Sequence, residues 1–256
     1  MNILGTCLEM LLMINEEIFK KYVGTFDISC PPINRKLYHS FRVSEISKKI
    51  ALSLNLDEDL VKLATFIGLV HDIGRFTQWK NYGTYVDFDS EDHASLGVKI
   101  LFEDHIISEF IIDSKWNNVI YNAVKNHNEY MLNSKVDEVS LLMAKILRDA
   151  DKLDILYMVA SGLVAVEQSD AEVSKEVNKE FLEKKSIEGK YLKNSTDKIL
   201  LRLALVFDLN FEYSLNCVLV NKYLQSIYER VKNKKIIEPY YMVVKNYLKE
   251  KCSGKI

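Results

Sequence analysis

The most apolar stretch of the chain is residues 60–74, which read LVKLATFIGLVHDIG. Apolar side chains cover nearly the whole circumference of a helix over 57–71, which is typical of a helix in the middle of a core. The stretch closes on His71 and Asp72, and Gly74 follows as an expected C-terminal stop. An ionised carboxylate without a partner would be unfavourable there. Either a bound cation resolves this conflict, or Asp72 is a capping residue beside a hydrogen-bonded histidine.

The rest of the chain also favours helices. Nine glycines and three prolines are few for 256 residues. We expect a loop at 26–32, a loop or lid at 79–89, and helices at 34–54, 90–103, 115–128, 139–160, 198–207 and 213–231. The predicted fold class is all-α, a compact helical bundle. We expect a single domain over 1–256, with a core at about 35–160 and a helical extension at about 161–256.

Further ligand-type side chains lie on the apolar faces of the expected helices, namely His39, His93, His127 and Asp151. Any one of them is more often a hydrogen-bonded core residue, but four together with His71 and Asp72 favour a common site. His105 follows the acidic pair Glu103-Asp104 and is expected at the surface. Imidazole and carboxylate donors suit Mn, Fe, Co, Ni or Zn. Two ions about 3.5–4 Å apart can support metal-assisted phosphoryl hydrolysis.

Composition restricts the partners of the chain. Its net charge is -2 and its pI about 6.2, so bulk nucleic acid is not an expected partner. Cys7, Cys30, Cys217 and Cys252 are widely spaced, which favours free thiols in a reducing compartment, the cytoplasm. The first residues lack a basic region and are too short to span a bilayer. A start at Met13 would fit equally well, with residues 1–12 as an extension.

The motifs YHSFRV (38–43), GLVHDIGRF (68–76), DHASLG (92–97), NHNEY (126–130) and RDADKLD (148–154) follow in this order. In this combination they resemble the HD superfamily of metal-dependent phosphohydrolases, over roughly residues 35–160. The resemblance implies a helical bundle of the HD-domain type. It also implies one metal ion held by His39, His71, Asp72 and Asp151, and a second held by His93 and His127, with Asp72 bridging.

This ligand set resembles that of the binuclear branches, such as the HD-GYP cyclic-dinucleotide phosphodiesterases and the dinucleoside-tetraphosphate hydrolases. The GYP signature is absent, however, because His127 is followed by NEYMLNSKVDEVS. A cyclic dinucleotide is therefore not the expected substrate. In similar proteins a lysine in the place of Lys152 lies near the substrate phosphate, and a solvated helix lysine is the alternative.

We therefore expect a hydrolase that cleaves a phosphoester or phosphoanhydride, most plausibly of a nucleotide, by a metal-activated hydroxide. One or two divalent ions (Mn, Fe, Co, Ni, Zn or Mg) are the expected cofactors. Asp72 would bridge the ions, and Lys152 and Arg75 would neutralise the phosphoryl oxygens. Arg75 could instead form a structural ion pair. Two other functions stay open, a di-iron oxygenase on the same scaffold, similar to myo-inositol oxygenase, and a non-catalytic nucleotide sensor. No membrane partner is expected, and the sequence leaves the oligomeric state open.

Overall fold

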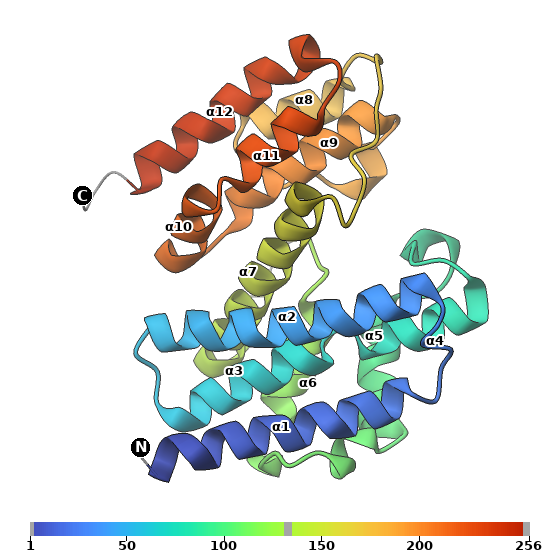
Figure 1. The fold of residues 1–256 in the computed structure, drawn as a ribbon, viewed down its shortest axis with the longest axis vertical. Coiled ribbons are helices and arrows are strands. Elements are labelled where there is room, and N and C mark those ends of the chain that lie inside the picture. The colour runs from blue at the N-terminus through green and yellow to red at the C-terminus, as the bar shows by residue number, and fades with distance from the viewer. Residues whose placement is uncertain (1–2, 131–134, 253–256) are drawn as a thin grey trace. The chain divides into compact units, whose positions relative to one another are not determined.

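The computed structural model describes residues 3–130 and 135–252, and no strand occurs within these ranges. The fold class is therefore all-α, as predicted. The α-helices are α1 (Ile3–Val23), α2 (Pro31–Ser53), α3 (Glu58–Val70), α4 (Ile73–Tyr82), α5 (His93–Val98), α6 (Asn117–Asn126), α7 (Glu138–Ser161), α8 (Lys175–Leu182), α9 (Ser195–Ala204), α10 (Glu212–Val220), α11 (Tyr223–Arg230) and α12 (Lys234–Cys252). Figure 1 shows this order along the chain. No helix of the described ranges has the length and apolarity that a membrane crossing requires.

The chain divides into two compact units, residues 1–150 and 151–256, and the division falls inside α7. Unit 2 corresponds closely to the segment that the sequence indicates as a C-terminal extension. Whether the two units act as one domain stays a prediction.

Helix α3 forms the centre of unit 1. It packs against α1, α2 and α6, and Figure 1 shows α1, α2 and α3 lying side by side. Every residue from Leu63 to Val70 is buried, as the apolar circumference predicts. A Cβ at Gly68 would lie 2.7 Å from Ser47 Oγ and 2.9 Å from Ser44 Cα, so α2 and α3 approach too closely there for a larger side chain.

The chain turns sharply between α3 and α4, at His71 and Asp72. Asp72 precedes α4 with φ -101° and ψ 18°, which interrupts the helical backbone. The prediction that Gly74 ends the helix expected over 57–71 is wrong, because that helix ends at Val70 and Gly74 lies inside α4. A Cβ at Gly74 would overlap the carbonyl oxygen of His93 and lie 2.7 Å from Gly97 N, so this glycine lets α5 approach α4. The break therefore comes from Asp72, and Gly74 serves the packing.

Other boundaries also differ from the sequence prediction. The last residue of helix α4 is Tyr82, and Gly83 follows it with φ 65°. Of the expected lid at 79–89, only the part after Tyr82 therefore lies outside an α-helix. The expected helix 90–103 is α5 followed by a π-helical turn at Lys99–Glu103. The expected helix 213–231 is two helices, because Lys222 adopts φ 54° between α10 and α11.

Unit 2 is formed by the second part of α7 and by α8 to α12. Helix α12 packs against α8, α9, α10 and α11. Phe181 on α8 packs edge-on against Phe207 and Tyr240, with ring centroids 5.2 and 5.3 Å away. These aromatics therefore pack against one another within unit 2.

The described cysteines Cys30, Cys217 and Cys252 form no disulfide, as expected, and the side chain of Cys7 lies outside the described part.

Candidate metal centre

Four histidines surround the carboxylate of Asp72, two at each oxygen. The Nε2 atoms of His39 and His71 lie 3.5 and 3.6 Å from Asp72 Oδ2. The Nε2 atoms of His93 and His127 lie 3.5 and 3.6 Å from Asp72 Oδ1. All five side chains are buried. The structure thus brings together five of the six predicted ligands around one carboxylate and divides the histidines into two pairs.

The ends of α3 and α6 orient His71 and His127. Each histidine directly follows the last residue of its helix, where backbone carbonyls lack a partner within the helix. His71 Nδ1 lies 2.8 Å from Gly68 O, and His127 Nδ1 lies 2.7 Å from Val124 O. A carbonyl only accepts, so Nδ1 carries the proton and donates it. This leaves the lone pair of Nε2 directed toward Asp72 in both rings.

His93 is oriented by a carboxylate instead of a carbonyl. Its Nδ1 donates to Asp87 Oδ2 at 2.7 Å, which likewise leaves a lone pair on Nε2. Burial lowers the pKa of His93, so the ring is neutral near pH 7. The Nε2 atoms of His93 and His127 then face each other at 3.1 Å with a lone pair on each. Two lone pairs at this distance repel, and a cation beside them removes the repulsion.

These separations fit shared metal ions. Two donors bound tetrahedrally to one ion, each about 2.0–2.1 Å from it, lie about 3.3 Å from each other. The four distances from Nε2 to Asp72 are all 3.5 or 3.6 Å. Imidazole nitrogens with a shared carboxylate suit divalent transition metals. His71, Asp72 and His127 also offer ligand atoms within 4.8 Å of one another. Asp151, the sixth predicted ligand, is the first residue of unit 2 and lies on α7. The side chains that are present therefore fit a metal centre.

Lys36 is the cation that contacts Asp72 directly. Its Nζ donates to Asp72 Oδ2 at 2.5 Å, from a position one helical turn before His39 on α2. Burial alone would raise the pKa of Asp72, but the charge of Lys36 and the surrounding histidines more than offset this effect. The pKa of Asp72 is therefore held well below its usual range, and the carboxylate is ionised.

Arg75 lies beside the candidate centre, but its guanidinium already has partners. Nη1 donates to Gln78 Oε1, to the backbone oxygen of Tyr85 and to Asp87 Oδ1, at 2.7–2.8 Å. Its Nε lies 3.6 Å from Asp72 Oδ1. The geometry is that of the ion pair which the sequence leaves open as an alternative. Arg75 also reinforces Asp87, whose pKa is lowered to about 2 because the hydrogen bond from His93 and nearby positive charge outweigh its burial.

Lys152 is buried in unit 2, and its Nζ lies 2.8 Å from Asp208 Oδ2. His105, in contrast, is exposed and adopts φ 58°, in agreement with its predicted place at the surface.

Sequence reasoning missed Lys36, Asp87 and Arg148 as residues of this centre. The spacing of three residues between Lys36 and His39 could have identified Lys36, because it places both on one helix face. Asp87 lies in an irregular segment, where no periodicity exists. Arg148 is buried and donates from Nη1 to the backbone oxygens of His127, at 3.1 Å, and Glu129. It therefore stabilises the backbone that carries His127.

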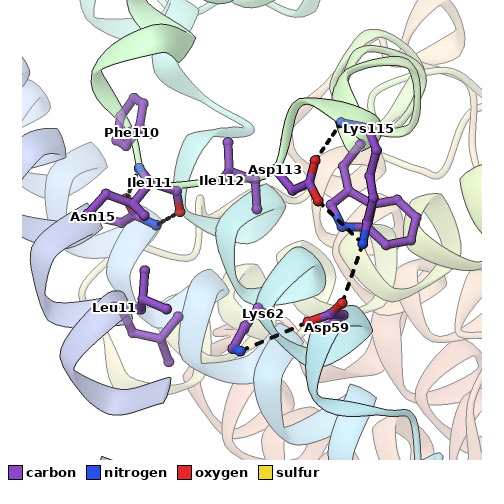
Figure 2. Close-up of a pocket in the computed structure, with 11 residues that line it drawn as sticks. Leu11, Asn15, Asp59, Lys62, Phe110, Ile111, Ile112, Asp113 and Lys115 are labelled. Carbon is purple, nitrogen blue, oxygen red and sulfur yellow. Dashed lines mark hydrogen bonds and ion pairs between the residues drawn. The ribbon is translucent and has the colours of Figure 1, made fainter. Parts of the chain in front are cut away.

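A separate hollow of about 490 Å³ lies in unit 1, between α1, the start of α3 and the segment 110–116 (Figure 2). Leu11, Phe110 and Ile112 contribute apolar walls, and Asp59 and Lys62 contribute charges. Asn15 joins two of its sides through hydrogen bonds to both backbone polar atoms of Ile111, at 3.1 and 2.8 Å. None of the predicted site residues lines this hollow.

The cluster of buried histidines around Asp72, in an all-helical fold, could hold a metal ion. A family model described as the HD domain matches residues 37–156. Searches among curated proteins and among solved structures found no match. Residues 37–156, somewhat less than half of the chain, therefore match the HD domain, which is the domain of a superfamily of metal-dependent phosphohydrolases. The matched segment contains all six predicted ligands.

Proposed function

We propose that this chain is a metal-dependent phosphohydrolase that cleaves a phosphoester or phosphoanhydride bond, with a nucleotide as the substrate class. The observation that carries the proposal is the division of four imidazoles between the two oxygens of Asp72. This arrangement fits one ion at each oxygen, and hence a bridging role for Asp72. The nucleotide class rests on the family resemblance and on no contact in the site.

Bound divalent ions would lower the pKa of a coordinated water and offset negative charge on a phosphoryl group. The protein itself contributes the orientation of its donors and a buried, water-poor setting. Protons on Nδ1 of His71, His93 and His127 keep each Nε2 available for an ion. Asp72 stays ionised because of Lys36 and the histidines. Because the whole chain has a net charge of only -2, attraction of an anionic substrate depends on local cations.

In this proposal Asp151 is a metal ligand, and Lys152 neutralises charge on the substrate phosphate. The role of Asp151 rests on the resemblance of RDADKLD (148–154) to the family's motif and on its place within the matched segment 37–156. Lys152 would have to exchange its partner Asp208 for a substrate oxygen. Arg75 would act as a fixed positive charge beside Asp72, because its Nη1 is already occupied.

The test is a phosphate-release screen over nucleotides, dinucleotides and simple phosphate esters. It uses purified protein with Mn, Fe, Co, Ni, Zn or Mg, together with metal analysis. The Asp72→Asn variant keeps the shape of the side chain but loses the bridging charge, so we expect loss of bound metal and at least a hundredfold loss of turnover, about 3 kcal/mol. His105→Asn is the matched control, since Asn tolerates the left-handed conformation of this exposed residue.

Full turnover by Asp72→Asn would contradict the assignment of the site. Oxygen uptake by the iron-loaded protein, without phosphate release, would instead support a di-iron oxygenase. Tight nucleotide binding with no turnover in any metal would support a sensor.

A further inference from the structure

Lys36 and the expected metal ion compete for the same atom. Lys36 Nζ lies 2.5 Å from Asp72 Oδ2, and this is the oxygen that His39 and His71 approach to 3.5 and 3.6 Å. An ion held by these two histidines would bind the same oxygen. Two positive charges at one carboxylate oxygen repel strongly in a buried setting. An ion at Oδ2 therefore has to displace the ammonium group of Lys36.

The side chain of Lys36 is able to move. It is 19% exposed, whereas that of Asp72 is 3% exposed, so the lysine reaches the carboxylate from the solvent side. Its four-carbon stem has several rotatable bonds and a compact charge. The centroid of the Tyr85 ring lies 5.7 Å from Nζ. A cation–π interaction with this ring would stabilise the ammonium group once it has left Asp72.

The other two cations that the sequence indicates for phosphate binding are less available. Arg75 Nη1 makes three hydrogen bonds, and Lys152 is paired with Asp208 in unit 2. Within the described ranges, Asp72 is the carboxylate with which Lys36 forms its ion pair. When an ion takes this partner, Lys36 becomes a cation without a counter-charge beside the reacting centre. Under the proposed function, the next anion to arrive there would be a phosphoryl group of the substrate.

We propose that Lys36 is a phosphate-binding residue that exchanges partners. It pairs with Asp72 in the metal-free protein, releases Oδ2 to the ion, and then binds a phosphoryl oxygen of the substrate. The proposal rests on the proposed function for the identity of the anion. It makes two predictions of opposite sign for removal of the lysine charge, namely tighter metal binding and weaker phosphate binding.

The test compares wild type with Lys36→Met by calorimetry. First, MnCl₂ is titrated into the metal-free protein, and we expect the variant to bind Mn²⁺ about tenfold more tightly, because the competing charge is gone. Second, inorganic phosphate is titrated into the Mn-loaded protein, and we expect at least about tenfold weaker binding, the loss typical of one charged hydrogen bond. Lys36→Arg keeps the charge and should restore phosphate binding to within a few-fold of wild type.

Arg35→Met is the matched control, because Arg35 is the exposed neighbour of Lys36 on α2. It removes the same charge one position away and should change neither affinity more than about twofold. Lys36→Gln carries the same predictions if the Met variant does not fold.

Unchanged phosphate affinity in a folded variant would overturn the proposal. So would a loss of both affinities, which indicates that Lys36 only supports the structure. Neither titration needs turnover, so the outcome is separate from that of the phosphate-release screen. If the Lys36 variants show the expected changes in Mn²⁺ and phosphate affinity but the wild type hydrolyses nothing, the proposed function is contradicted. The role of Lys36 in binding phosphate then still stands.

Discussion

Single residues determine which nitrogen of each histidine faces the carboxylate. His71 and His127 use the carbonyls that the ends of their own helices leave unpaired, at Gly68 and Val124. A histidine placed directly after a helix can therefore be oriented without any additional residue. His93 starts α5 instead of following it, so it has no such carbonyl and depends on Asp87.

Loss of Asp87 should weaken metal binding without unfolding the protein. In Asp87→Ala, the Nδ1 proton of His93 loses its acceptor, and the ring can rotate or bind through the wrong nitrogen. We expect metal affinity to fall about 10- to 100-fold, the usual cost of removing such a partner. Titration with Mn²⁺ measures this change, and circular dichroism checks the fold.

Asp89→Ala is the control for this variant, because Asp89 lies in the same 3₁₀ turn (Asp87–Asp89) and is exposed. Equal affinities of Asp87→Ala and wild type would show that His93 needs no orienting partner.

At the residue scale, the sequence predicts the inward placement of His39, His93 and His127, because helical periodicity defines it. It does not predict Asp87, which reaches His93 from an irregular segment. The sequence also does not determine the partners of Arg75, because they depend on where the segment after Gly83 folds back. Such contacts follow from tertiary structure and have no signal in local spacing.

At the scale of elements, the centre depends on how closely α4 and α5 approach. A glycine is required where the two backbones come close, and both Gly74 and Gly97 lie there. The structure assigns this role to Gly74, because a Cβ at Gly97 would meet its nearest atom, Val124 Cγ1, at an ordinary 3.5 Å. Both glycines lie in the same interface, and only the three-dimensional contact decides which of them is required.

Opposite effects are expected from alanine at these two glycines. Gly74→Ala would overlap the carbonyl oxygen of His93, so it should destabilise the protein by about 1–3 kcal/mol. It should also weaken metal binding, because His93 shifts. Gly97→Ala should be neutral or stabilising by up to about 1 kcal/mol, since Ala favours helices. Urea unfolding of the metal-free variants measures both changes.

If Gly74→Ala were as stable as Gly97→Ala, the close approach of α4 and α5 would not be a requirement of the fold.

Element boundaries were less predictable than element identity. The apolar core of α3 and the inward faces of α2, α6 and α7 follow from periodicity. The break at Asp72, the π-helical turn at Lys99–Glu103 and the left-handed Lys222 depend instead on backbone conformations that composition does not specify. The break at Asp72 matters most, because it turns the carboxylate toward four histidines.

For the whole molecule, the all-α class and the HD domain at residues 37–156 agree with the sequence prediction. The sequence predicts a helical extension from about residue 161, close to the start of unit 2 at residue 151. No linker rich in Gly, Pro or Ser marks the division, because the boundary lies within one helix. Residues 161–256 carry no motif, so their role cannot be derived from spacing. Their capping box at Asn194 and Asp197 and their aromatic contacts explain their fold.

The central feature of the proposed centre is a pair of ions that share Asp72. Anomalous scattering from crystals of the Mn-loaded protein tests directly whether both ions bind there. We expect two peaks, one at Oδ2 with His39 and His71, and one at Oδ1 with His93 and His127. Fully occupied Mn²⁺ elsewhere in the molecule, or a single peak that leaves one pair of histidines without an ion, would contradict it.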